Sequence, residues 1–171
     1  MLTSTIVIEV GEQTLRLADY AGPGHRMLRG EGSHVPRPTG DISADCVLNL
    51  ETSADSGQAV TMTLEYYAAD EPRPEPGPTW VLDGEGIFPR RSSDPLYAVN
   101  ELLEWSFFDI DAPIGDHRFE AWVEGREENR AAIAAWQAAR DSPEGRLIPW
   151  EEASKTVPIS LERWLIRLIA T

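Results

Sequence analysis

The chain has 171 residues, 42% of them hydrophobic, and a formal net charge of −14. This length and apolar content exclude a disordered chain and predict a single folded domain spanning residues 1–171. The acidity argues against direct binding of nucleic acid or of an anionic membrane surface, because both require basic side chains to neutralise phosphates. The apolar runs are shorter than the roughly 20 residues that span a membrane. The stretch MLTSTIVIEV lacks the basic region and cleavage site of a signal peptide, so we expect a cytoplasmic protein.

The first segments predict two strands and a long loop. Residues 4–10 (STIVIEV) and 14–19 (TLRLAD) are rich in alternating apolar side chains and are joined by the turn sequence GEQ, which predicts an N-terminal hairpin. Residues 20–41 contain five glycines, three prolines and two histidines and show neither a helical nor a strand period. They predict a long loop, and loops of this length in folded domains are often functional or mobile.

The next segments are the clearest predicted strands. Residues 46–51 and 59–67 alternate apolar with polar side chains, which is typical of strands with one face in a core. Cys46, the only cysteine, excludes an intrachain disulfide and is expected as a small buried residue. Residues 68–79 (AADEPRPEPGPT) hold four prolines and therefore predict a stiff, extended surface loop rather than a strand or helix.

The second half of the chain mixes strands with one helix. The stretch WVLDGEGIFP predicts two short apolar pieces around a tight turn at Asp83–Gly84. Residues 96–111 begin with helical spacing and end like a strand, so both interpretations stay open. HRFEAWVEG alternates like a half-buried strand. The alanine-rich residues 126–140 predict a helix, with two glutamates in the first turn and an arginine in the last.

The end of the chain completes the predicted fold. A second short helix is expected around PWEEASK, and SLERWLIRLIA predicts a last strand. Short strands at this spacing, with turn residues between them, are typical of sandwiches. The sequence therefore predicts a mainly β protein: an antiparallel β-sandwich of about seven to nine strands with one inserted α-helix near residues 127–140.

The stretch DIDAPIGDHRFEAW, at residues 109–122, has three interpretations: a two-carboxylate hydrolase site, a metal site and a structural turn. Asp109 and Asp111 would share one face of an extended strand, about 6.5 Å apart, and His117 would add a nitrogen ligand from across the turn, which together suit a hard cation. Alternatively, the Pro-Ile-Gly sequence forms a turn between two strands, and the aspartates cap its backbone. We favour the turn, because the stretch lacks EF-hand spacing and the whole chain is rich in acids.

The other catalytic patterns are missing from the sequence. It has no nucleotide-binding glycine loop, no HExxH zinc motif and no GxSxG nucleophile motif, so we expect no enzymatic activity and no cofactor. The alternative is a metal- or small-molecule-binding sandwich, with or without enzymatic activity, that uses His25 and His34 in the loop at residues 20–41. A further hypothesis is a carbohydrate or small-molecule module with exposed stacking rings, Trp122 first among the six tryptophans, although large aromatic side chains more often fill a core.

Three stretches resemble a known family. FFDIDAPIGDHRFEAWVEGREE, IVIEVGEQTLRLAD and ERWLIRLIA are similar to stretches of bacterial β-sandwich proteins, namely the competence-associated inhibitor of DNA-entry nuclease and related small actinobacterial proteins. The resemblance implies a non-enzymatic protein that binds a protein. It transfers no functional residue, because the similar positions are turn and core positions, and residues 22–78 lie outside it.

The charge distribution suggests where such a partner would bind. Residues 65–85 carry six acidic side chains and one arginine, on and around the proline-rich loop. Acidic surfaces steer basic partners, and stiff loops lose less entropy on binding. We therefore expect an acidic interaction protein, an inhibitor or immunity-type binder of a basic protein such as a nuclease. The partner-binding residues predicted on this basis are Asp70, Glu71, Glu75, Asp83 and Glu85.

Overall fold

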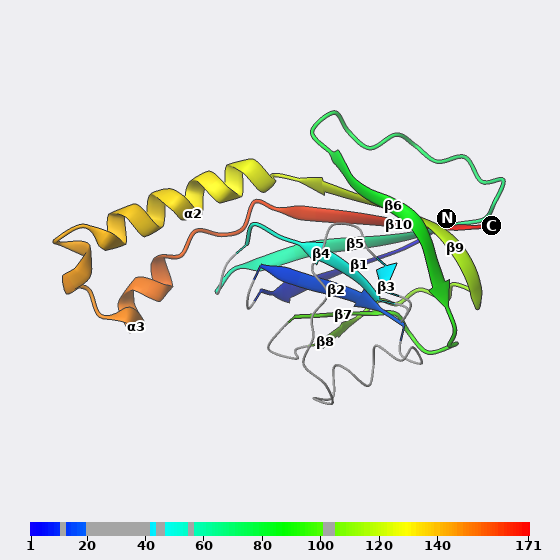
Figure 1. The fold of residues 1–171 in the computed structure, drawn as a ribbon, viewed down its shortest axis with the longest axis horizontal. Helices are drawn as coiled ribbons and strands as arrows, with labels where there is room; N and C mark the ends of the chain where they lie inside the picture. The colour runs from blue at the N-terminus through cyan, green and yellow to red at the C-terminus, as the bar shows by residue number, and fades with distance from the viewer. Residues whose placement is uncertain (11–12, 20–41, 44–46, 55–56, 101–104) are drawn as a thin grey trace.

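The computed structural model describes residues 1–10, 13–19, 42–43, 47–54, 57–100 and 105–171. In this part of the chain, ten strands form two five-stranded sheets that face each other (Figure 1). Sheet A has the strand order β1-β5-β10-β9-β6 and sheet B has the order β3-β4-β2-β7-β8. The mainly β sandwich predicted from the sequence is confirmed. The strands are β1 (Leu2–Glu9), β2 (Thr14–Ala18), β3 (Ile42–Ser43), β4 (Val47–Glu51), β5 (Ala59–Tyr67), β6 (Val81–Arg90), β7 (Tyr97–Val99), β8 (Trp105–Phe107), β9 (Gly115–Glu124) and β10 (Arg163–Ala170).

The core lies between the two sheets and follows the alternation in the sequence. Along β5, Val60, Met62 and Leu64 are buried, whereas Thr61 and Thr63 on the other face are partly exposed. Side chains from both sheets join one cluster, which burial of apolar surface stabilises. Its members include Ile8, Leu17, Leu48, Phe88, Phe119, Trp164 and Ile166.

Strand β10 lies in the middle of sheet A. It pairs parallel with β5 and antiparallel with β9. Trp164 and Ile166 enter the core, as the alternation predicts, but Leu165 and Arg167 on the opposite face are buried as well. A central strand whose two faces are both buried reads as a nearly continuous apolar run, which explains the sequence WLIRLIA.

The prediction of an N-terminal hairpin is wrong. Strand β1 pairs with β5 in sheet A, whereas β2 pairs with β4 and β7 in sheet B. The Val10 amide donates to the carbonyl of Gln58, which closes the β1–β5 pairing, and the chain then crosses to the other sheet. Both strands still bury their apolar side chains in the same core, so alternation alone could not separate a hairpin from a crossing between sheets.

The prediction of a tight turn at Asp83–Gly84 is also wrong. Residues 81–90 form one continuous strand along β9, and the register shifts between Leu82 and Gly84. The extra residue makes a β-bulge, and glycine is common in β-bulges as well as in tight turns. Two residues later, a Cβ atom at Gly86 would lie 2.9 Å from the Phe119 ring, so glycine is needed there for packing rather than for a turn.

The proline-rich segment connects β5 to β6 across sheet A. Both strands run in the direction of β10, so the connection must pass from one end of the sheet to the other. Figure 1 shows residues 68–80, here called the strap, running on the face of sheet A that is turned away from sheet B. The strap contains no helix or strand, as its four prolines predict.

The predicted helix is confirmed as α2 (Arg126–Asp141). It continues through the short helices η1 (Gly145–Leu147), α3 (Trp150–Ala153) and η2 (Ser154–Thr156), which confirm the expected second helical segment. In Figure 1 this helical pair projects beyond one end of the sandwich, and residues 157–161 return from it to β10. We call residues 126–161 the arm. Within the described residues, no helix combines the length and apolarity required to cross a membrane.

Candidate protein-interaction surface

The strap presents two of the five predicted partner-binding carboxylates without a counter-ion. Asp70 and Glu75 are exposed, and among the described residues neither has an ion-pair partner. Glu71 is different, because it pairs with the amino group of Met1 and accepts a hydrogen bond from the Ala68 amide (3.2 Å). The hydrogen bond from the Met1 amino group is the main cause that lowers the pKa of Glu71, and the Ala68 amide adds to it.

The other two predicted carboxylates lie on β6 and are paired with arginines. Asp83 contacts Arg126 at 2.5 Å, and Glu85 contacts Arg118 at 3.1 Å. The five residues therefore belong to two neighbouring elements, and their charges are not equally available to a partner. Of the five carboxylates, Asp70 and Glu75 are the two whose negative charge no neighbouring cation in the described structure neutralises.

A buried polar group lies at the strap's first end, on the outer face of sheet A. Arg167 donates to Glu65 at 2.9 Å, and the Tyr67 hydroxyl donates to the same carboxylate at 2.8 Å. Arg167 also lies over the Tyr67 ring, 5.7 Å from its centroid. Burial and then the hydrogen bond to Glu65 raise the pKa of Tyr67 to about 12. Arg167 holds Glu65 and Tyr67 in place where the strap leaves β5.

The far end of the strap is fixed to the sheet as well. Thr79 donates to Glu124, which also pairs with Arg163. The Arg163 guanidinium lies 5.8 Å from the centroid of the Trp80 ring. With Glu71 held at one end and Thr79 at the other, the strap keeps its proline-rich middle in one place, which reduces the entropy lost on binding.

The structure does not gather Asp109, Asp111 and His117 into a metal site. The two aspartates are exposed, while His117 is buried, with its ring edge-on to Tyr66 and its Nε2 atom donating to the carbonyl of Pro113 at 2.7 Å. No group of three or more histidine, cysteine, aspartate or glutamate side chains in the described residues could hold a metal ion. The stretch instead links β8 in sheet B to β9 in sheet A, so it joins sheets rather than the strands of a hairpin.

Several candidate residues lie outside the described part of the chain. These are Cys46 and the loop at residues 20–41, with His25 and His34. The tryptophans can be placed. Trp164 is in the core and Trp122 is half-buried on the outer face of sheet A, where its Nε1 atom donates to Glu120 at 3.4 Å. Helix α2 does not cover that face, because it projects away from the sandwich.

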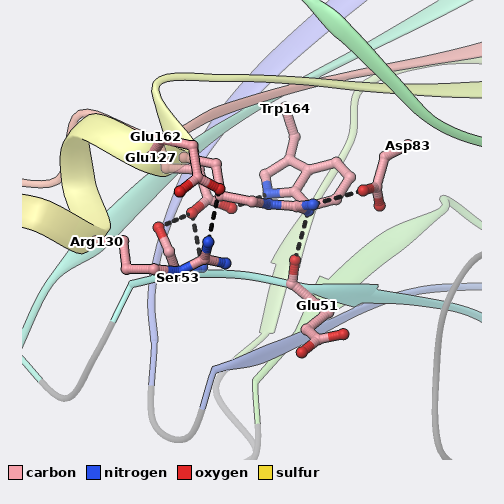
Figure 2. Close-up of polar contacts among 8 residues, drawn as sticks. Glu51, Ser53, Asp83, Glu127, Arg130, Glu162 and Trp164 are labelled. Atoms are coloured by element: carbon pink, nitrogen blue, oxygen red, sulfur yellow. Dashed lines mark hydrogen bonds and ion pairs between the residues drawn. The ribbon is translucent and has the colours of Figure 1, made fainter.

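A buried polar network at the base of the arm was not found from the sequence. Figure 2 shows Glu162 between Ser53 and Trp164. One Glu162 oxygen accepts from the amide and hydroxyl of Ser53 (2.7 and 2.5 Å), and the other accepts from Trp164 Nε1 at 2.8 Å. Arg126, the first residue of α2, lies over the Trp164 ring at 5.0 Å and donates to the Glu51 carbonyl at 2.7 Å.

Asn129 extends this network one turn along α2. Its side chain is buried and donates to Ser53 (3.2 Å) and Gln58 (3.1 Å), while its carbonyl oxygen accepts from the Leu161 amide (3.2 Å) and from Gln58. A single asparagine among alanines was the available signal, since a buried amide must find partners. The network fixes the direction in which the arm leaves the sandwich.

The outer end of the arm exposes apolar side chains beside a group of stacked side chains. Arg140 lies 4.6 Å from the Trp150 ring and 6.0 Å from the Trp136 ring, and Trp136 Nε1 donates to Thr156 at 3.1 Å. A Cβ atom at Gly145 would lie 2.2 Å from a backbone oxygen of α2, so the chain turns there tightly. Beyond this group, Leu147 and Ile148 remain exposed.

The chain is similar to known proteins in structure but not in sequence. No family model and no curated protein sequence matches the chain. Its structure is similar to the crystal structure of ComJ, inhibitor of the DNA degrading activity of NucA, from Bacillus subtilis, with a TM-score of 0.51 and 10% sequence identity over 98% of this chain and 95% of that chain. It is also similar to the crocagin biosynthetic gene J protein, with a TM-score of 0.44 and 13% identity over 98% and 96%. The resemblance to the competence nuclease-inhibitor proteins is therefore confirmed at the level of the fold.

Proposed function

We propose that this protein is a non-enzymatic, inhibitor-type binder of a basic protein, such as a nuclease, and that the strap is the part of its surface that meets the partner. The observation that carries the proposal is the pair of unneutralised carboxylates, Asp70 and Glu75, on a segment stiffened by prolines and fixed at both ends. Such a segment offers negative charge to a partner at a small cost in conformational entropy.

The distribution of charge supports this choice of surface. Most acidic side chains on sheet A are neutralised locally, as in the pairs Glu65–Arg167 and Glu124–Arg163. Asp70 and Glu75 have no ion-pair partner among the described residues, and their charges add to the field of a chain whose net charge is −14. A field of this sign attracts a basic partner from a distance and speeds its association at low salt.

The fold supports the inhibitor part of the proposal. ComJ, whose fold this chain shares, is an inhibitor of the DNA degrading activity of NucA. A nuclease must present basic groups to the phosphates of DNA, and an acidic protein surface competes for those groups. The likeness in fold and the acidity of this chain thus point to the same class of partner.

The test begins with capture of the partner. Tagged protein is incubated with a lysate of its own host at low salt, bound proteins are eluted with high salt, and they are identified by mass spectrometry. A captured basic protein is then purified, and its degradation of DNA is measured with and without the tagged chain. We expect stoichiometric inhibition that weakens as salt rises, because screening shortens the reach of the charges.

Two double variants then separate local charge from overall charge. Asp70→Lys with Glu75→Lys reverses the strap, and Glu9→Lys with Glu128→Lys makes the same change in net charge at exposed positions elsewhere. We expect the strap variant to slow association by about tenfold or more at low salt and the control to act far less. If both variants slow association equally, the overall acidity of the chain, and not the strap, attracts the partner. Unchanged inhibition by the strap variant would contradict the proposal.

A further inference from the structure

We propose that the tip of the arm, formed by Leu147, Ile148 and Trp150, is a self-association surface on which a second copy of this chain docks. Of the thirteen large apolar side chains that the described part of the chain exposes, these three lie within four consecutive residues. At the tip the exposed fractions are 84% for Leu147, 47% for Ile148 and 57% for Trp150. Contiguous apolar exposure of this kind marks interaction sites in soluble proteins.

The tip is presented by a fixed frame. The network of Arg126 and Asn129 holds the base of the arm, and the stacking of Arg140 on Trp136 and Trp150 holds its end. Leu147 and Ile148 therefore stay exposed because no other part of the described chain covers them. A surface that is ordered before contact loses little entropy when it docks.

The charge of the arm makes it the part of the chain that repels a second copy least. Residues 126–161 carry five basic and six acidic side chains, so the arm has a net charge of −1 and the rest of the chain carries −13 of the total −14. A basic partner gains little attraction from such an arm. Another copy of this chain meets less repulsion there than at the rest of the chain, which carries nearly all of the net charge.

The length of the arm strengthens this argument. The sixteen residues of α2 extend about 24 Å at about 1.5 Å per residue, whereas the Debye length at physiological salt is about 8 Å. Two copies that touch tip to tip keep their acidic sandwiches several Debye lengths apart. Their mutual repulsion is then largely screened, which is not so for a contact through either sheet.

The rim of the tip is self-complementary. In the described structure, the exposed side chains of Asp141, Glu144, Glu151 and Glu152 have no ion-pair partner, and neither have Arg146 and the chain's only lysine, Lys155. A twofold contact places the same patch on both copies, so the acidic side chains of one copy can lie against the basic side chains of the other. An apolar centre with unpaired charges of both signs around it satisfies that condition.

Sedimentation velocity of the full chain over a range of concentrations tests this proposal. We expect a reversible monomer–dimer equilibrium that added salt leaves unchanged or strengthens, since salt screens the repulsion between the sandwiches. Leu147→Asp should raise the dimer dissociation constant at least about tenfold, because the twofold contact loses the leucine twice. Ile114→Asp, the same change at a loop position that is 60% exposed, serves as the matched control and should leave the equilibrium unchanged.

Three outcomes would overturn the proposal. The first is a chain that stays monomeric at every concentration. The second is an equal rise of the dimer dissociation constant in Leu147→Asp and Ile114→Asp. The third is a monomeric chain that loses its binding to the captured basic protein when Leu147 is replaced by Asp. The last result would assign the tip to that partner instead. The proposal stands apart from the function proposed above, because reversal of the strap charges at Asp70 and Glu75 should leave the dimer intact.

Discussion

The start of the arm depends on Gly125, and its replacement gives the sharpest test of the structure. Gly125 precedes α2 with a φ of +75°, and a Cβ atom there would lie 2.1 Å from the carbonyl oxygen of Leu161. That oxygen belongs to the backbone that returns from the arm, and the amide of the same residue is held by Asn129. Neither side of the contact can move without breaking the buried network.

The cost of Gly125→Ala has two parts. A left-handed φ costs an L-residue about 1–2 kcal/mol, and overpacking against a fixed neighbour costs about 1–3 kcal/mol. The free energy of unfolding should therefore fall by roughly 2–5 kcal/mol. With a urea dependence of about 2 kcal/mol per molar, the unfolding midpoint should drop by about 1–2.5 M.

Urea unfolding followed by tryptophan fluorescence measures this shift, and Gly57→Ala is its matched control. Gly57 has a φ of +89°, but the nearest atom to a Cβ there is 4.0 Å away, so only the conformational cost applies. The control should lose about 1–2 kcal/mol, and the gain from a less flexible unfolded chain is the same in both variants. Equal losses for the two variants would refute the claim that the Leu161 carbonyl makes glycine necessary.

Two further predictions concern buried polar groups. Asn129→Ala removes the partner of the Leu161 amide and the two hydrogen bonds between Asn129 and Gln58, so the free energy of unfolding should fall by about 2–4 kcal/mol. Arg130→Ala, at an exposed position one residue further on, should cost less than about 0.5 kcal/mol. Similar losses of the two variants in urea unfolding would contradict the network. Burial raises the pKa of Tyr67 from its ordinary value of 10.0 to about 12, so its hydroxyl stays protonated in the folded state at a pH at which the unfolded chain has ionised. Its contribution to stability should therefore be complete below about pH 10 and disappear between about pH 10 and 12, and Tyr67→Phe should remove this part of the alkaline loss of stability.

The sandwich was predictable because its strands carry their own signal. Strict alternation in residues 59–67 and 117–124 reports one face in a core, whichever strand lies alongside. The pairing of the strands could not be predicted in this way, because which strands lie side by side depends on contacts between residues far apart in the sequence. The turn sequence at residues 11–13 suits a hairpin equally well, and only the pairing of β1 with β5 sends β2 to the other sheet.

The candidate surface was predictable in part, for a similar reason. The sequence shows that residues 65–85 are acidic, but it does not show that Asp83 forms an ion pair with Arg126 and Glu85 with Arg118. The helix at residues 126–141 followed from its alanines, yet its direction did not. The helix has only two large apolar residues, Ile133 and Trp136, and this stripe is too small to lie on a sheet, so that feature of the sequence indicates a projecting element.

The central position of β10 also sets the timing of assembly during synthesis. Thr61 and Arg163 face each other in the β5–β10 pair although 102 residues separate them. At about 5–20 residues per second, the ribosome needs roughly 5–20 s to cover that distance. Throughout this interval β5 lacks β10 at one edge, and β9 lacks it too once residue 124 has been made. Unpaired edges of apolar strands recruit other chains. A nascent chain that stalls between residues 124 and 163 therefore exposes two such edges at once, which favours its binding by chaperones before it can bind any partner.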